Sequence, residues 1–152
     1  MSDDIRLRRA GPMDAPAIRA LTREAYAKWV PLIGREPKPM MADYVAALRE
    51  HRFDLLYRGD RLAALIETIR KSDHLLIENV AVLPALQGRG LGRRHMAHAE
   101  ELAVTAGLNQ IRLYTNARFT DNVRLYERLD YRVDREEDFK GGRVVHMSKP
   151  IR

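Results

Sequence analysis

The sequence contains no cysteine, which excludes disulfides, thiolate metal sites and a cysteine nucleophile. This absence suits a reducing compartment, so we expect the protein to be cytoplasmic. No apolar run approaches the roughly 20 residues that a membrane-spanning helix needs, so we expect no membrane partner. The first residues, from Met1 to Asp4, are acidic and lack an apolar stretch, so we expect no secretion signal.

A dense run of basic residues is also absent, although the formal net charge is +6. The 27 lysines and arginines are spread along the chain, so we expect no nucleic-acid partner, and RNA or nucleotide binding stays as an alternative. Scattered positive charge suits smaller anions such as phosphates. The length of 152 residues and the 45% share of hydrophobic residues fit one globular domain over residues 1–152.

Hydrophobic periodicity and turn residues predict an α/β fold with a mixed sheet, in the order β-α-α-β-β-β-α-β-α-β-β. Asp14 is the expected N-cap of the first helix, and residues 30–39, which hold three prolines and a glycine, are expected to form a loop. The expected strands cover residues 5–8, 53–57, 61–69, 74–82, 110–115, 131–136 and 143–147. The expected helices cover residues 14 to about 29, 40–50, the segment after a glycine-rich turn to about 106, and about 121–129.

The glycine-rich turn lies between the apolar run Leu75 to Leu83 and the helical pattern that continues to about Ala106. Three glycines within six residues leave backbone N–H groups exposed at the positive end of a helix, which favours phosphate or another anion. The turn is not followed by Lys-Ser or Lys-Thr, so it is not a P-loop. It consists of Gln87, Gly88, Arg89, Gly90, Leu91 and Gly92.

Three blocks together resemble the GNAT family of N-acetyltransferases. They are Glu78-Asn79-Val80-Ala81-Val82, the turn Gln87 to Gly92, and Asn122 to Tyr131, which contains Leu125-Tyr126-Glu127. The element order agrees with that family from end to end. The resemblance implies a GNAT-like single domain and an acetyl-CoA-dependent N-acetyltransferase. Asp130 stands where the family usually has glycine, and we expect it to adopt left-handed backbone geometry there.

The resemblance also implies how the coenzyme is held. The N–H groups from Gly88 to Arg93 would bind the coenzyme A pyrophosphate, and either Arg93 or Arg94 would reach the 3′-phosphate. The strand segment Val80-Ala81-Val82 would pair with the pantetheine amides, and the Val82 N–H would polarise the thioester carbonyl. Core packing of the two valine side chains is compatible with this use of their backbone.

Asn122 and Tyr126 are four residues apart, so on a helix they share one face. The resemblance implies that Asn122 hydrogen-bonds the pantetheine arm and that Tyr126 protonates the departing thiolate. A phenol suits this role because its pKa near 10 keeps it protonated at pH 7. The alternative is an amphipathic helix with a half-buried tyrosine.

Glu78 interrupts an apolar strand, where a carboxylate is costly unless it is paired, hydrated or at a cleft. By resemblance it is a general base that takes the proton of the attacking amine, directly or through water. The alternative is a glutamate at the strand edge that pairs with an arginine. The sequence leaves both interpretations open.

The acceptor side of the site falls, by resemblance, in the region of the first two helices. Its candidates are Tyr26, Trp29 and Ile33, with Pro31, Met40 and Tyr44 nearby; the alternative is that these residues only dock the helices on the sheet. Aromatic residues suit an apolar or cationic amine. His95 and His98 show no third ligand, so we expect no metal site and interpret them as part of a solvated face.

We therefore expect direct transfer of an acetyl group to a primary amine in a ternary complex. A small-molecule acceptor is favoured over a peptide, and the family suggests a homodimer. A catalytically silent acyl-CoA-binding sensor with the same fold is the alternative function.

Overall fold

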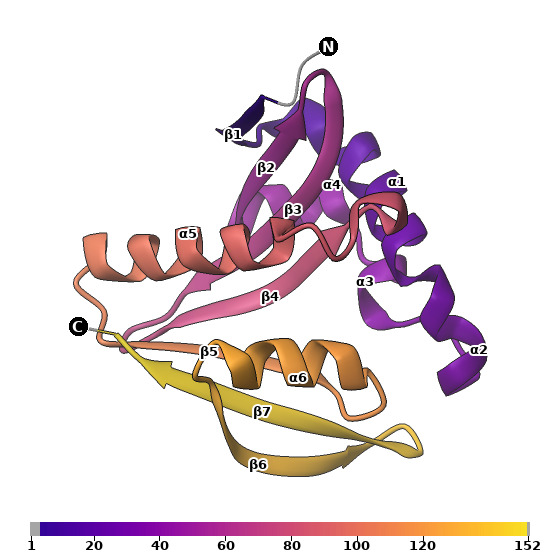
Figure 1. The fold of residues 1–152 in the computed structure, drawn as a ribbon, viewed down its shortest axis with the longest axis vertical. Helices are drawn as coiled ribbons and strands as arrows, with labels where there is room; N and C mark the ends of the chain where they lie inside the picture. The colour runs from indigo at the N-terminus through magenta and orange to yellow at the C-terminus, as the bar shows by residue number, and fades with distance from the viewer. Residues whose placement is uncertain (1–3, 152) are drawn as a thin grey trace.

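The structure, a computed structural model, describes residues 4–151. The expectation about a secretion signal rests largely on residues 1–3, which lie outside the described range. One seven-stranded sheet runs through the molecule in the order β1-β2-β3-β4-β5-β7-β6 (Figure 1). It contains parallel and antiparallel pairs, so the prediction of a mixed sheet is confirmed. Its strands are β1 (Ile5–Arg9), β2 (Arg52–Arg58), β3 (Arg61–Arg70), β4 (Leu75–Val82), β5 (Gln110–Asn116), β6 (Arg132–Phe139) and β7 (Gly142–Pro150).

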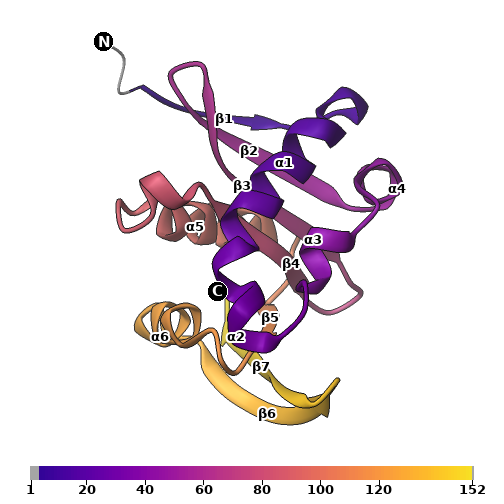
Figure 2. The same cartoon turned by 90° about the vertical axis from the view of Figure 1, so that its right-hand side faces the viewer.

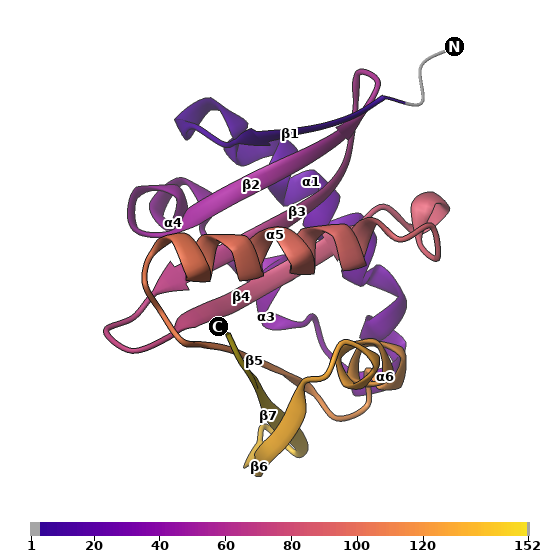
Figure 3. The ribbon, with the colours of Figure 1, turned by 60° about the vertical axis from the view of Figure 1, so that its left-hand side comes forward.

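Helices cover both faces of this sheet, with the first helices on one face and α5 on the other (Figures 2 and 3). One hydrophobic cluster includes Ile18 and Leu65, and a second includes Met96 and Ile111, so apolar side chains are buried on each face. No helix within residues 4–151 is long and apolar enough to cross a bilayer. The α-helices are α1 (Ala15–Tyr26), α2 (Val30–Ile33), α3 (Lys38–Met41), α4 (Tyr44–Glu50), α5 (Leu91–Thr105) and α6 (Thr120–Arg128), with 3₁₀ turns η1 (Pro12–Asp14), η2 (Ala27–Trp29) and η3 (Pro84–Leu86).

The prediction of a loop over residues 30–39 is wrong, because α2 and the start of α3 lie within it. Pro31 and Pro39 stand in the first turns of these two helices, where a missing N–H breaks no helical hydrogen bond. The single helix predicted over 40–50 is also wrong. The backbone is extended at Asp43, whose carboxylate accepts a hydrogen bond of 3.1 Å from Ala46 N and thereby starts α4 separately.

Asp14 does precede α1, but its side chain makes no capping bond to that helix. Its carboxylate instead accepts a hydrogen bond of 2.8 Å from Gly11 N and forms an ion pair of 2.9 Å with Arg8. The predicted left-handed geometry of Asp130 is confirmed, with φ of 73°. The predicted hairpin is confirmed as well, since Phe139 of β6 is opposite Gly142 of β7.

The two halves of the sheet separate between β4 and β5. These strands are parallel, as predicted for a strand–helix–strand unit, but they pair only over Leu75–Ile77 and Ile111–Leu113. On the other side of β4 the register slips by one residue: Ile77 is opposite Thr68 and Asn79 is opposite Glu67. Glu78 therefore occupies a β-bulge at the point where β4 leaves β5, and a bulge re-aims the side chain that it carries.

Candidate active site

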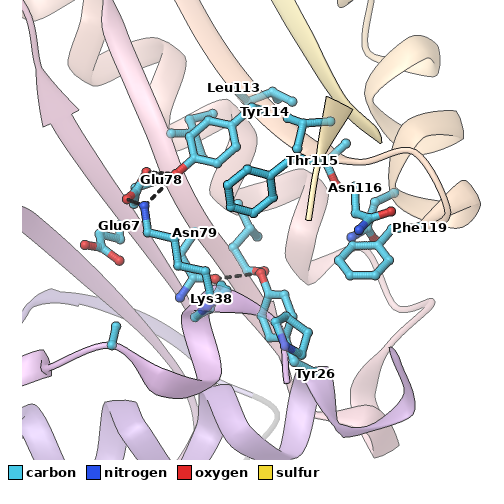
Figure 4. A pocket seen from close by; sticks show the side chains of 18 of the residues that line it. Tyr26, Lys38, Glu67, Glu78, Asn79, Leu113, Tyr114, Thr115, Asn116 and Phe119 are labelled. Carbon is cyan, nitrogen blue, oxygen red and sulfur yellow. Dashed lines mark hydrogen bonds and ion pairs between the residues drawn. The ribbon is translucent and has the colours of Figure 1, made fainter. Parts of the chain in front are cut away.

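A cleft of about 600 Å³ opens where β4 and β5 separate. Side chains from both halves of the sheet line it, including Glu78 from β4, Tyr114 from β5 and Tyr126 from α6 (Figure 4 shows the first two). Because these positions are far apart in the sequence, the tertiary fold and not local structure brings them together.

The edge of β4 that faces away from β3 carries Val80, which lines this cleft, and Val82. Leu83 N donates to Ala63 O of the β3 side at 2.9 Å, and alternate residues of a strand point to opposite edges. The carbonyl oxygens of Val80 and Val82 accept hydrogen bonds from side chains, from Tyr26 at 3.2 Å and from Gln87 at 3.1 Å. By the same alternation, their N–H groups point to the edge of β4 that faces away from β3. Between them, Ala81 is buried in the core.

The glycine turn forms the N-terminus of α5, as predicted. Gly88 and Gly90 have φ of +80° and +82°, a backbone conformation that a side chain would strain. The first intrahelical hydrogen bond runs from Arg94 N to Gly90 O at 3.0 Å, so the N–H groups of Leu91, Gly92 and Arg93 have no intrahelical acceptor. N–H groups without an intrahelical acceptor at the positive end of a 15-residue helix favour an anion, and the side chains of Arg89, Arg93 and Arg94 are exposed beside them.

Gly92 lies where α5, α6 and the edge of β4 meet. A Cβ atom added there would stand 3.8 Å from a methyl group of Leu125 and 3.9 Å from one of Val82. The start of α5 is therefore packed close to α6 and to the end of β4 at residue 92.

Helix α6 brings Asn122 and Tyr126 to the cleft on one face, as the four-residue spacing predicted. Tyr126 is 8% exposed, so it is buried rather than half-buried. This burial raises the pKa of Tyr126 to about 12. The phenol is therefore protonated at neutral pH and has a proton to give.

Glu78 has two partners in the cleft, and neither is an arginine. Its carboxylate accepts a hydrogen bond of 2.5 Å from the Tyr114 hydroxyl and lies 3.5 Å from Lys38 Nζ (Figure 4). The Glu78 side chain is 17% exposed, so it is reachable by a ligand or by water. Pairing with an arginine, the alternative left open by the sequence, is thus wrong for residues 4–151.

A second carboxylate that the sequence reading missed, Glu67, lines the same cleft. It accepts a hydrogen bond of 2.6 Å from His51, and burial raises its pKa, an effect to which the nearby Glu78 adds. A signal was present, because Glu67 and Tyr114 interrupt apolar strands in the way that Glu78 does. That signal could not be used without knowing which strands are neighbours.

The acceptor candidates divide into two groups. Tyr26 and Ile33 line the cleft, and the Tyr26 hydroxyl donates to Asn79 Oδ1 at 2.7 Å. Burial raises the pKa of Tyr26 well above 10. Trp29 does not line the cleft; it stacks on Phe119 with ring centroids 4.4 Å apart and so links the α1 side to the loop before α6.

Among the described residues there is no group of three side chains that could hold a metal ion. The interpretation of His95 and His98 as a solvated face is wrong for His95, which is fully buried. The reason is that α5 lies across the sheet, and the face that carries Met96 and Ala99 also turns His95 inward. Burial lowers the pKa of His95 to about 4.

Known proteins share this sequence pattern and this fold. The model of the acetyltransferase (GNAT) family matches residues 17–131. Among solved structures, the ribosomal-protein-S18-alanine N-acetyltransferase of Escherichia coli superposes with a TM-score of 0.80 at 20% identity, covering 97% of this chain and 94% of that one. The PaiA N-acetyltransferase of Thermoplasma acidophilum, solved with coenzyme A, gives 0.81 at 16% identity with 97% and 99% covered.

A Bacillus subtilis acetyltransferase, also solved with coenzyme A, gives a TM-score of 0.75 at 18% identity and covers 97% of this chain and 99% of that one. At these identities the neighbours show the fold alone, whereas the family match covers most of the sequence. The chain belongs to the acetyltransferase (GNAT) family.

Proposed function

We propose that this protein is an acetyl-CoA-dependent N-acetyltransferase that acts on a small primary amine. The observation that carries the proposal is the separation of β4 from β5, which brings the edge of β4 at Val80, the carboxylate of Glu78 and the buried phenol of Tyr126 around one cleft. These are the groups that an acyl transfer from a thioester to an amine requires. The glycine turn follows β4 along the chain and begins α5.

The residues present fit coenzyme A. The unpaired N–H groups of Leu91, Gly92 and Arg93 would hold the pyrophosphate, and the exposed Arg93 or Arg94 would meet the 3′-phosphate. The edge of β4 at Val80 and Val82 would pair with the pantetheine amides, and Asn122 would support that arm from α6. When bound, acetyl-CoA supplies an acetyl group joined to a thiolate leaving group.

Each reacting atom then has a partner on this chain. The Val82 N–H donates to the thioester carbonyl oxygen and stabilises the negative charge that develops there. Glu78, directly or through water, takes the proton that the attacking amine must lose. A C–N bond forms, the C–S bond breaks, and Tyr126 protonates the departing sulfur. Because the chain has no cysteine, an acyl-enzyme on a cysteine is excluded.

A small acceptor is favoured because two contacts join different elements at the cleft. Arg35 lies over the ring of Phe139 at 5.7 Å, which joins the segment before α3 to the β6–β7 hairpin. Arg118 donates to Leu32 O at 2.9 Å beside the stacked Trp29 and Phe119. Links of this kind would hinder the approach of an extended peptide. The Escherichia coli neighbour is nevertheless named for a protein acceptor, so peptides with a free N-terminus belong in the test.

The test is a coenzyme A-release assay with acetyl-CoA across a library of amines and peptides, run beside Tyr126→Phe. Release that depends on an amine and falls in the variant supports the proposal. Tight binding of acetyl-CoA with no transfer to any amine would favour the alternative, a silent acyl-CoA sensor.

A further inference from the structure

The cleft already contains a primary amine of the protein itself. Lys38 Nζ lies 3.5 Å from Glu78 Oε2 and 3.4 Å from the Tyr114 hydroxyl, and it lies 5.9 Å from the centre of the Tyr114 ring (Figure 4). A carboxylate, a hydroxyl and an aromatic face are the partners that an incoming ammonium group would need. Lys38 thus occupies the position next to the candidate base that an acceptor amine must reach.

The backbone at this side chain is restricted, whereas its tip is held only by weak contacts. Pro37 and Pro39 flank Lys38 and restrict the backbone there, and the Tyr44 hydroxyl holds Pro39 O at 2.5 Å. The Lys38 side chain is 68% exposed, so its ion pair with Glu78 is a weak one. Little free energy therefore opposes a small displacement of the amine from Glu78.

The other lysines have different surroundings. Lys28 donates to Gln87 at 2.8 Å and Lys149 to Glu100 at 3.1 Å, while Lys71 and Lys140 are exposed and outside the cleft. Of the five lysines in the chain, all within the described residues, Lys38 is the one that lines the cleft.

We propose that Lys38 is a site of self-acetylation: with acetyl-CoA bound and no acceptor present, the enzyme transfers the acetyl group to its own Lys38. The inference rests on the proposed function. Glu78, or water beside it, takes the ammonium proton, and the neutral Lys38 nitrogen attacks the acetyl carbonyl. The new amide C–N bond forms as the C–S bond breaks, and Tyr126 protonates the leaving thiolate. The second proton that the Lys38 nitrogen loses on becoming an amide leaves to solvent by the same route as the first, and Tyr126 regains its proton from solvent. Acetylation removes the charge of Lys38 and with it the ion pair to Glu78.

The experiment incubates the folded full chain with acetyl-CoA that carries an isotope label in its acetyl group, without acceptor, and follows each lysine over time by peptide mass spectrometry. We expect Lys38 to gain the label at least about tenfold faster than Lys71 and Lys140, a difference within reach of one acid–base group. The chain unfolded in urea gives the rate of uncatalysed labelling.

Two variants distinguish labelling of Lys38 by the enzyme from direct reaction of lysines with acetyl-CoA. Glu78→Gln should slow labelling of Lys38 to the rate of the exposed lysines and leave Lys71 and Lys140 unchanged. Lys38→Arg should lose the label at this position while thermal melting shows an unchanged fold. Equal rates at all exposed lysines, or a Lys38 rate that does not respond to Glu78→Gln, would overturn the inference.

The failure of this inference can be told from that of the proposed function. If coenzyme A release depends on an amine but Lys38 is labelled only at the background rate, the inference of self-acetylation is wrong and the proposed N-acetyltransferase activity still holds. An absence of transfer to any library amine, with rapid labelling of Lys38, would keep the inference and remove the small-molecule acceptor.

Discussion

The Tyr114 hydroxyl donates a 2.5 Å hydrogen bond to Glu78 across the gap between β5 and β4. The last parallel pair of these strands is Ile77 with Leu113, so Glu78 and Tyr114 are the next residue on each strand. A side-chain hydrogen bond thus takes over where the backbone pairing ends. It fixes the candidate base at the apex of the cleft.

Replacing Tyr114 by phenylalanine should therefore lower kcat/KM by roughly 10-fold or more, since a hydrogen bond to a charged group contributes about 1.5–3 kcal/mol. Steady-state kinetics measure the effect once an acceptor is known. The matched control is Tyr57→Phe, which removes a hydroxyl that accepts from Arg8 outside the cleft. Equal kcat/KM values in the two variants would show that Tyr114 does not position the base.

Tyr126→Phe should lower kcat by about 100-fold while the Kd for acetyl-CoA changes little, because the phenol acts on the leaving sulfur and not on the bound ground state. The control is Tyr131→Phe: that hydroxyl is buried without a hydrogen-bond partner among residues 4–151, and its ring lies 6.1 Å from that of Tyr126. We expect kcat to be unchanged in the control. An unchanged kcat in Tyr126→Phe would remove its role as the acid.

The substitutions Gly90→Ala and Gly92→Ala should have opposite effects on the stability of the fold. Gly90 has a left-handed backbone, so Gly90→Ala should cost about 1–2 kcal/mol of unfolding free energy. Gly92 is helical and a Cβ atom there meets only ordinary contacts, so Gly92→Ala should keep or raise the melting temperature. Its methyl group would nevertheless lie against Leu125 and Val82, beside the N–H groups proposed to hold the pyrophosphate, and we expect the Kd for acetyl-CoA to rise.

For Gly90→Ala and Gly92→Ala, calorimetric titration measures the Kd for acetyl-CoA and thermal melting measures the change in stability. A Gly92→Ala protein that binds acetyl-CoA as tightly as the native chain would show that the coenzyme does not lie close to residue 92.

His95 should make the fold sensitive to acid. Its pKa is about 4 in the folded protein and about 6.5 when unfolded, so between these pH values the unfolded chain binds the extra proton. Stability contributed by neutral His95 is present above pH 6.5 and is lost as the pH falls toward 4, by about 3 kcal/mol in total. Urea unfolding across this range should show the loss, and His95→Leu should flatten it. The same slope in the variant would assign the acid sensitivity to other groups.

The sequence determined much of the fold because strand and helix periodicity are local properties. The β4–α5–β5 crossover, the β6–β7 hairpin and the left-handed Asp130 all follow from neighbouring residues. Local rules failed in the segment from Val30 to Glu50, where prolines that usually indicate a loop stand instead in the first turns of short helices. Which role a proline takes there depends on what the helix packs against.

The sequence by itself also determined that the turn from Gln87 to Gly92 starts a helix and that Asn122 and Tyr126 share one face, since both depend on short-range spacing. Only the tertiary structure decided the partners of Glu78. Whether a strand carboxylate meets an arginine, a tyrosine or a lysine depends on strand order and on the bulge that re-aims it, and these are long-range features. For the same reason the burial of His95 and the position of Lys38 beside Glu78 could not be read from the chain alone.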